Sequence, residues 1–262
     1  MKYQLETIPV WDAFEKQSEC PLCDLQNESD KSYAEAALGG AVVESDYRIE
    51  SNEKGYCGRH LPMLYDHRPR LGLAYILHTH LVETTKVMES AMKSISGGSK
   101  TGGGLFSRIL GDQGGSDEPG SSQSACEKAI RKRTKTCVLC EKTDTAMKRY
   151  IYTIFHLYRK ETEFRKAFRD SKGFCLPHLA DIIGMGNKHL SGQPRDEFFT
   201  ELVNIQSENF TRLADELQWF TKKHDYRYKD EDWKTSRDAL PRVINKLRGN
   251  TIPIDKNKAD DD

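Results

Sequence analysis

The stretches Cys20-Pro21-Leu22-Cys23 and Cys57-Gly58-Arg59-His60 follow one another in the chain with 33 residues between them. The same pattern then recurs: Cys137-Val138-Leu139-Cys140 precedes Cys175-Leu176-Pro177-His178, with 34 residues between them. Cysteine and histidine in CxxC and CxxH pairs are typical ligands of tetrahedral structural zinc. Two copies in register indicate an internal duplication, in which each copy carries three thiols and one imidazole.

The nearly equal gaps favour metal sites that form within each copy. The predicted ligand sets are Cys20, Cys23, Cys57 and His60 for one zinc ion, and Cys137, Cys140, Cys175 and His178 for a second. In the alternative, the ligands pair across copies, so that Cys20 and Cys23 join Cys175 and His178. Metal-free or redox-active thiols and an iron–sulfur cluster are further alternatives. Because four protein ligands fill a tetrahedron, the predicted sites are structural rather than catalytic.

The composition excludes some classes of protein. The chain has 262 residues, with 40 basic and 40 acidic side chains, whereas dedicated nucleic-acid binders are usually basic overall. Residues 1–19 carry acidic side chains and lack a long apolar core, so we expect no secretory signal. No apolar run approaches the roughly 20 residues that span a bilayer. We therefore expect a cytoplasmic protein without membrane contact, whose reduced cysteines hold metal.

The chain is interrupted by a segment rich in glycine and serine, residues 94–124. Such a composition is typical of a flexible linker, because it buries too little apolar surface to offset the entropy of ordering. The predicted division is a first helical unit in residues 1–93, the linker, and a second unit in 125–225. Residues 226–262 are then expected to pack back on the body and to end in a disordered tail.

On both sides of this segment, apolar residues recur at spacings of three and four, which predicts amphipathic helices. The three such stripes run from Ala74 to Met92, from Met147 to Tyr158 and from Phe199 to Phe220. No alternating strand pattern is present. We therefore predict an all-α fold of two tandem repeats. Each repeat consists of a CxxC, a helix, a return, a CxxH at a helix start and a long helix.

Other polar residues carry weaker signals. His78, His80 and His156 are interpreted as hydrogen-bonded side chains between helices, although pairing with Glu83 or Glu161 is an alternative. The basic run at residues 128–135 adjoins the second CxxC, as in some nucleic-acid binders. It lacks interleaved aromatic residues, so a solvated helix face is the simpler interpretation.

Several segments resemble an uncharacterised family of bacterial cytosolic proteins that is known only as a domain of unknown function. The resemblance covers nearly the whole chain apart from the Gly/Ser-rich segment, and all eight expected ligands are intact. Some members of the family carry automatic labels as transporter substrate-binding proteins, but the resemblance implies no activity. Segments that carry it include Tyr3–Phe14, Leu38–Val42, Lys54–His60, Leu71–Leu81, Ser171–His178 and Asp238–Gly249.

The sequence contains neither an HExxH motif nor a Gly-rich phosphate loop between a strand and a helix. The leading hypothesis is therefore a non-enzymatic zinc-binding protein that acts as an interaction or regulatory module with a protein partner. The alternatives are a nucleic-acid-binding zinc protein and a thiol-based redox or metal sensor. The oligomeric state is left open.

Overall fold

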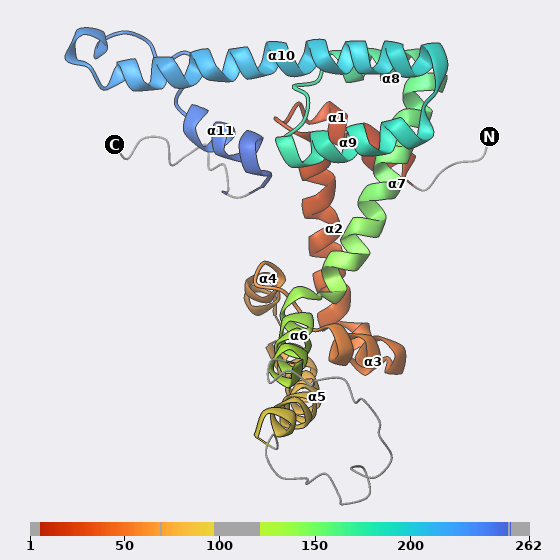
Figure 1. Ribbon diagram of the computed structural model, residues 1–262. Coiled ribbons are helices and arrows are strands. Elements are labelled where there is room, and N and C mark those ends of the chain that lie inside the picture. Colours follow the sequence, from red (N-terminus) through yellow and green to blue (C-terminus); the bar gives the residue numbers. More distant parts are fainter. Residues whose placement is uncertain (1–5, 69, 97–120, 251, 253–262) are drawn as a thin grey trace, which may run out of the picture. The chain divides into compact units, whose positions relative to one another are not determined.

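A computed structural model describes residues 6–68, 70–96, 121–250 and 252 (Figure 1). These residues form α-helices and short 3-10 turns, and no strand occurs among them. The predicted all-α class is therefore confirmed. Within the same residues, no helix is both long and apolar enough to cross a bilayer.

The chain divides into two compact units that do not follow the order of the motif copies. Residues 1–29 and 144–262 form what we call the terminal unit, and residues 30–143 form the middle unit. The boundaries fall inside helices α2 (Pro21–Leu38) and α7 (Val138–Lys160), the helices that begin at the two CxxC motifs. This division differs from the expected one at the Gly/Ser-rich segment, because α2 and α7 each contribute residues to both units.

The terminal unit contains α1 (Thr7–Glu15), the first part of α2 and most of α7. It also contains the 32-residue helix α10, which contacts α8 and α11 (Figure 1). The apolar stripes predicted on α7 and α10 do supply core residues, such as Ile151, Ile154, Leu202 and Ile205. The remaining elements are α8 (Thr162–Arg169), α9 (Leu176–His189), α10 (Gly192–Lys223), η2 (Tyr226–Tyr228) and α11 (Ala239–Arg248).

Aromatic rings form the centre of this core. Phe168 is wholly buried, and its ring centroid lies 5.0 Å from that of Phe198 and 5.3 Å from that of Tyr158. The rings of Phe14 and Phe174 lie 6.2 and 6.1 Å away. Phe168 therefore connects rings from α1, α7 and α10 with Phe174, which immediately precedes the CxxH cysteine Cys175.

The middle unit has a smaller core, which includes Leu64 and Ile76. Its longest helix, α5, packs against α3 and α6. The predicted helix is present, but the stripe from Ala74 to Met92 is not its buried side, because Leu81 and Met92 are 64% and 54% exposed. The elements are η1 (Gly40–Val43), α3 (Ser45–Lys54), α4 (His60–Asp66), α5 (Arg70–Ser96) and α6 (Ser121–Lys135), with the adjoining parts of α2 and α7.

Most of the expected linker, residues 97–120, lies outside the described residues, as does the expected disordered tail. The ends of the 94–124 segment are helical, because α5 extends to Ser96 and α6 begins at Ser121. The C-terminal helix α11 packs against α9 and α10.

Replacing Phe168 by alanine should lower the free energy of unfolding by about 3–5 kcal/mol, because the cavity would remove contacts with several rings. Urea denaturation of the metal-loaded protein measures this loss. The control is Tyr226→Ala at a side chain that is 86% exposed, where a change within about 0.5 kcal/mol is expected. Equal effects of the two substitutions would show that the ring cluster is not the main core.

Candidate metal centres

All four cysteine motifs lie at helix N-termini. Cys20 and Cys137 directly precede α2 and α7, Cys175 directly precedes α9, and His60 is the first residue of α4. In the first turn of α9, for example, the backbone N–H of Leu179 donates to the carbonyl of Cys175 over 2.8 Å. One helical turn places residues i and i+3 on the same face. The positive end of the helix dipole also favours thiolates at this position.

The side chains meet across the motif copies. The donor atoms of each set lie within 4.8 Å of one another. Pairing within each copy, the leading prediction, is therefore wrong, and the alternative pairing is confirmed. The two sets are Cys20, Cys23, Cys175 and His178, here called the terminal centre, and Cys57, His60, Cys137 and Cys140, here called the middle centre.

The path of α2 explains this pairing. Its 18 residues extend about 27 Å, and the prediction assumed that the chain then returns to its own CxxC. Instead, α2 passes from the terminal unit into the middle unit, where the chain forms the Cys57 turn. Helix α7 makes the opposite passage, from the middle unit into the terminal unit. Each CxxC therefore meets the CxxH of the other copy.

The terminal centre is fully buried. Nδ1 of His178 lies 3.5 Å from Sγ of both Cys20 and Cys23, and 3.3 Å from Sγ of Cys175. The Sγ atoms of Cys23 and Cys175 are 3.6 Å apart. A tetrahedral ion with bonds of about 2.0–2.3 Å requires ligand separations of about 3.5–3.8 Å. The geometry therefore fits a four-coordinate metal ion.

The middle centre has the same arrangement. Nδ1 of His60 lies 3.4, 3.3 and 3.4 Å from the Sγ atoms of Cys57, Cys137 and Cys140. The Sγ atoms of Cys57 and Cys140 are 3.5 Å apart. In contrast to the terminal centre, the side chains of Cys57 and Cys140 are only partly buried. Both centres can thus hold a metal ion through three sulfurs and one nitrogen.

Residues 1–253 match a described family of unknown function, DUF6062. The chain belongs to this family. No curated protein and no solved structure matches this chain. The resemblance noted in the sequence is thereby confirmed as membership of a family without an assigned activity.

A buried carboxylate supports the middle centre. Nε2 of His60 lies 3.1 Å from Oδ1 of Asp30, which also accepts a hydrogen bond of 2.7 Å from Thr143. Arg59 pairs with the other carboxylate oxygen of Asp30. This contact places a hydrogen on Nε2 and directs Nδ1 at the three sulfurs, as second-shell carboxylates do for metal-binding histidines. The sequence analysis missed Asp30, since nothing in the motif spacing marks it.

A buried lysine supports the terminal centre. Nζ of Lys246, on α11, donates to the carbonyls of Glu19 and Lys172 over 2.7 and 2.5 Å, next to the two cysteine turns. Burial lowers the pKa of Lys246, and the carboxylate of Glu19, followed by the nearby cysteines, opposes this effect. Asn250 donates to the carbonyl of Cys23 over 3.0 Å. The segment at the end of α11 thus fixes both halves of the centre, a role that sequence spacing did not reveal.

The sulfur and imidazole groups of each centre lie close enough to shift one another's pKa values. Burial by itself raises the pKa of Cys137, but hydrogen bonds from His60 and from backbone groups outweigh it and lower the pKa to about 6. Burial lowers the pKa of His60, yet the contact with Cys137 raises it overall. In the terminal centre, burial lowers the pKa of His178, but its hydrogen bonds to Cys175 and Cys20 outweigh this effect and raise the pKa to about 10. A metal ion must therefore displace protons from both centres.

The other predicted residues have different surroundings. His80 forms the expected hydrogen bond between helices, since its Nδ1 lies 3.0 Å from the carbonyl oxygen of Asn52. His78 and His156, in contrast, are exposed. In the basic run, Arg133 donates to the carbonyls of Asn52 and Glu53 at the end of α3. Part of this run thus stabilises a helix C-terminus.

Asp30→Asn should weaken metal binding at the middle centre about 10–100-fold, because an amide holds the His60 imidazole less strongly than a carboxylate does. Competition with a chromophoric chelator measures the affinity of each centre. Asp46→Asn, at an exposed carboxylate on α3, is the matched control and should bind both ions as the unchanged chain does. An unaltered middle centre in Asp30→Asn would contradict the role given to this carboxylate.

Metal affinity at the middle centre should fall as the pH is lowered through about 6. The pKa of Cys137 is lowered in the fold, so its thiolate is present above that pH and takes up a competing proton below it. The thiolate also stabilises the fold without metal. This contribution to the free energy of unfolding is complete above pH 9.0 and is lost as the pH falls through about 6. Chelator competition between about pH 5 and 8 tests this expectation. An affinity that does not change with pH would contradict it.

Proposed function

We propose that this protein is a non-enzymatic zinc-binding protein, in which two structural zinc ions stabilise a helical interaction or regulatory module. The observation that carries the proposal is the convergence of three sulfurs and one imidazole nitrogen at two places. Zinc accepts this mixture of ligands in tetrahedral geometry more readily than other common metals, and the four donors leave no position open for a reacting water.

The ligands of each centre are far apart in the sequence, which supports a structural role. Cys23 and Cys175 are separated by 152 residues, and Cys57 and Cys140 by 83. Such donors meet only in the folded state, so the free energy of metal binding contributes to the free energy of folding. Chains with small cores often rely on this source of stability, and the middle unit has the smaller of the two cores.

A regulatory role is favoured by one contrast between the centres. Cys57 and Cys140 of the middle centre are partly exposed, whereas the donors of the terminal centre are buried. Exposed thiolates react with oxidants more readily than buried ones. Thiol-based sensing at the middle centre is therefore the second candidate function. For both candidate functions, we propose that the protein is cytoplasmic and that its partner is another protein.

Elemental analysis of the purified chain should find two zinc ions, and their removal by a strong chelator should lower helicity measured by circular dichroism. Cys20→Ser should retain one zinc and unfold at a lower temperature, because the terminal centre loses a donor. Cys126→Ser is the control, since Cys126 belongs to neither centre, and it should retain both ions. A native preparation without metal, or a Cys20→Ser variant with two zincs and unchanged stability, would refute the proposal.

A further inference from the structure

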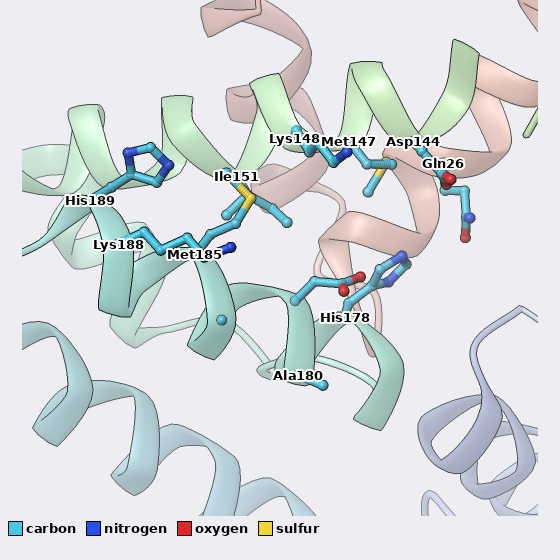
Figure 2. A pocket seen from close by; sticks show the side chains of 12 residues that line it. Gln26, Asp144, Met147, Lys148, Ile151, His178, Ala180, Met185, Lys188 and His189 are labelled. Carbon is cyan, nitrogen blue, oxygen red and sulfur yellow. The ribbon is translucent and has the colours of Figure 1, made fainter. Parts of the chain in front are cut away.

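A groove of about 560 Å³ lies between α7 and α9, within the terminal unit (Figure 2). Its apolar lining is provided by Met147, Ile151 and Met185. A second hollow, of about 390 Å³, shares Lys148, Met185 and His189 with it, so the two lie next to each other. The volume lies in the range of pockets that hold small ligands, roughly 300–1,000 Å³.

The terminal metal centre faces one end of this groove through His178. This side chain is 5% exposed, lines the groove and directs Nδ1 at the three sulfurs. With Nδ1 on a metal, Nε2 carries a hydrogen. In the described part of the chain, no side chain or carbonyl accepts from Nε2 of His178, although the same atom of His60 meets Asp30. Nε2 of His178 is not among the buried polar atoms without a partner, so it is open to the groove, and this end is suited to a ligand oxygen.

The groove carries carboxylates at one end and cationic side chains at the other, with the cation Lys148 between them. Asp144 lies beside His178 at one end, and Lys188 and His189 lie at the other (Figure 2). Asp181, one turn after His178 on α9, adds a second carboxylate to the first end. Among the described residues, neither Asp144 nor Asp181 forms an ion pair, and neither does Lys188. The groove thus has a carboxylate end, a middle in which Lys148 lies among the apolar side chains, and an ammonium end.

The spacing sets the length of a matching ligand. Asp181 and Lys188 are seven residues apart on α9, which corresponds to about 10 Å along the helix. An extended chain of three amino acids spans about 10 Å. Between these positions lies Gly184, where an added Cβ would meet nothing within 4 Å. The middle of the groove therefore has room for a chain that lies along α9.

We propose that this groove binds short peptides with free termini. The peptide ammonium group pairs with Asp144 and Asp181, and the first peptide carbonyl accepts from Nε2 of His178. Apolar peptide side chains cover Met147 and Met185, and the terminal carboxylate pairs with Lys188. This inference rests on the proposed interaction role and names the class of partner. It also links ligand binding to the terminal centre, because one ligand contact is made by a metal-binding histidine.

The test is calorimetric titration of the metal-loaded full chain with trileucine. One molecule should bind per chain. N-acetyl-trileucine, which lacks the ammonium group, and trileucine amide, which lacks the carboxylate, should each bind about tenfold more weakly or worse, because each loses a charged hydrogen bond. No binding of trileucine at about 5 mM, or equal binding of all three peptides, would overturn the inference.

Variants locate the binding site. Gly184→Leu should abolish trileucine binding, because the new side chain fills the open middle of the groove, while leucine favours the helix more than glycine does. Asp181→Asn should weaken binding about tenfold, and the matched control Asp215→Asn, on exposed α10 surface, should leave it unchanged. Undiminished binding in Gly184→Leu, with metal content and thermal unfolding intact, would overturn the assignment. Two bound zinc ions without peptide binding would refute this inference alone and leave the proposed function in place.

Discussion

Each metal centre joins the N-termini of two helices through side chains that lie far apart in the sequence. A CxxC turn supplies two sulfurs, and a CxxH turn from a distant segment supplies a sulfur and a nitrogen. The three sulfurs are close enough to repel one another as thiolates, so the arrangement is stable only when protons or a cation balance their charge. The joining of α2 to α9 and of α4 to α7 therefore depends on how this charge is balanced.

The two centres balance it differently. The middle centre has a buried carboxylate behind its histidine and partly exposed cysteines, so a metal ion there would be held within a polar shell near the surface. The terminal centre is enclosed, with the buried ammonium of Lys246 between its two cysteine turns. Three thiolates and a divalent ion carry a net negative charge, which a nearby cation offsets. Similar donor sets thus have different surroundings, and this difference favours a stabilising role for one centre and a responsive role for the other.

Much of the fold could be predicted from the sequence, because the signals concerned are local. The helical periodicity, the eight donors and the position of each motif at a helix start all depend on residues a few positions apart. The pairing of motifs could not be predicted, since gaps of similar length are compatible with either arrangement. It is decided by where α2 and α7 lead. Asp30 and Lys246 carry no spacing signal, because their roles arise only when helices distant in sequence meet. The buried side of α5 was predicted wrongly for the same reason. The helices that pack on α5 bury the side with Leu73 and Ile76.

The pairing across motif copies is the central claim, and metal stoichiometry in two double variants tests it directly. Cys20→Ser with Cys175→Ser removes two donors from one centre, so this chain should retain one metal ion per molecule. Cys20→Ser with Cys57→Ser removes a donor from each centre, so this chain should retain none. The reverse result, with one ion kept only when Cys20 and Cys57 are both replaced, would show that the ligands pair within each copy and would contradict the structure.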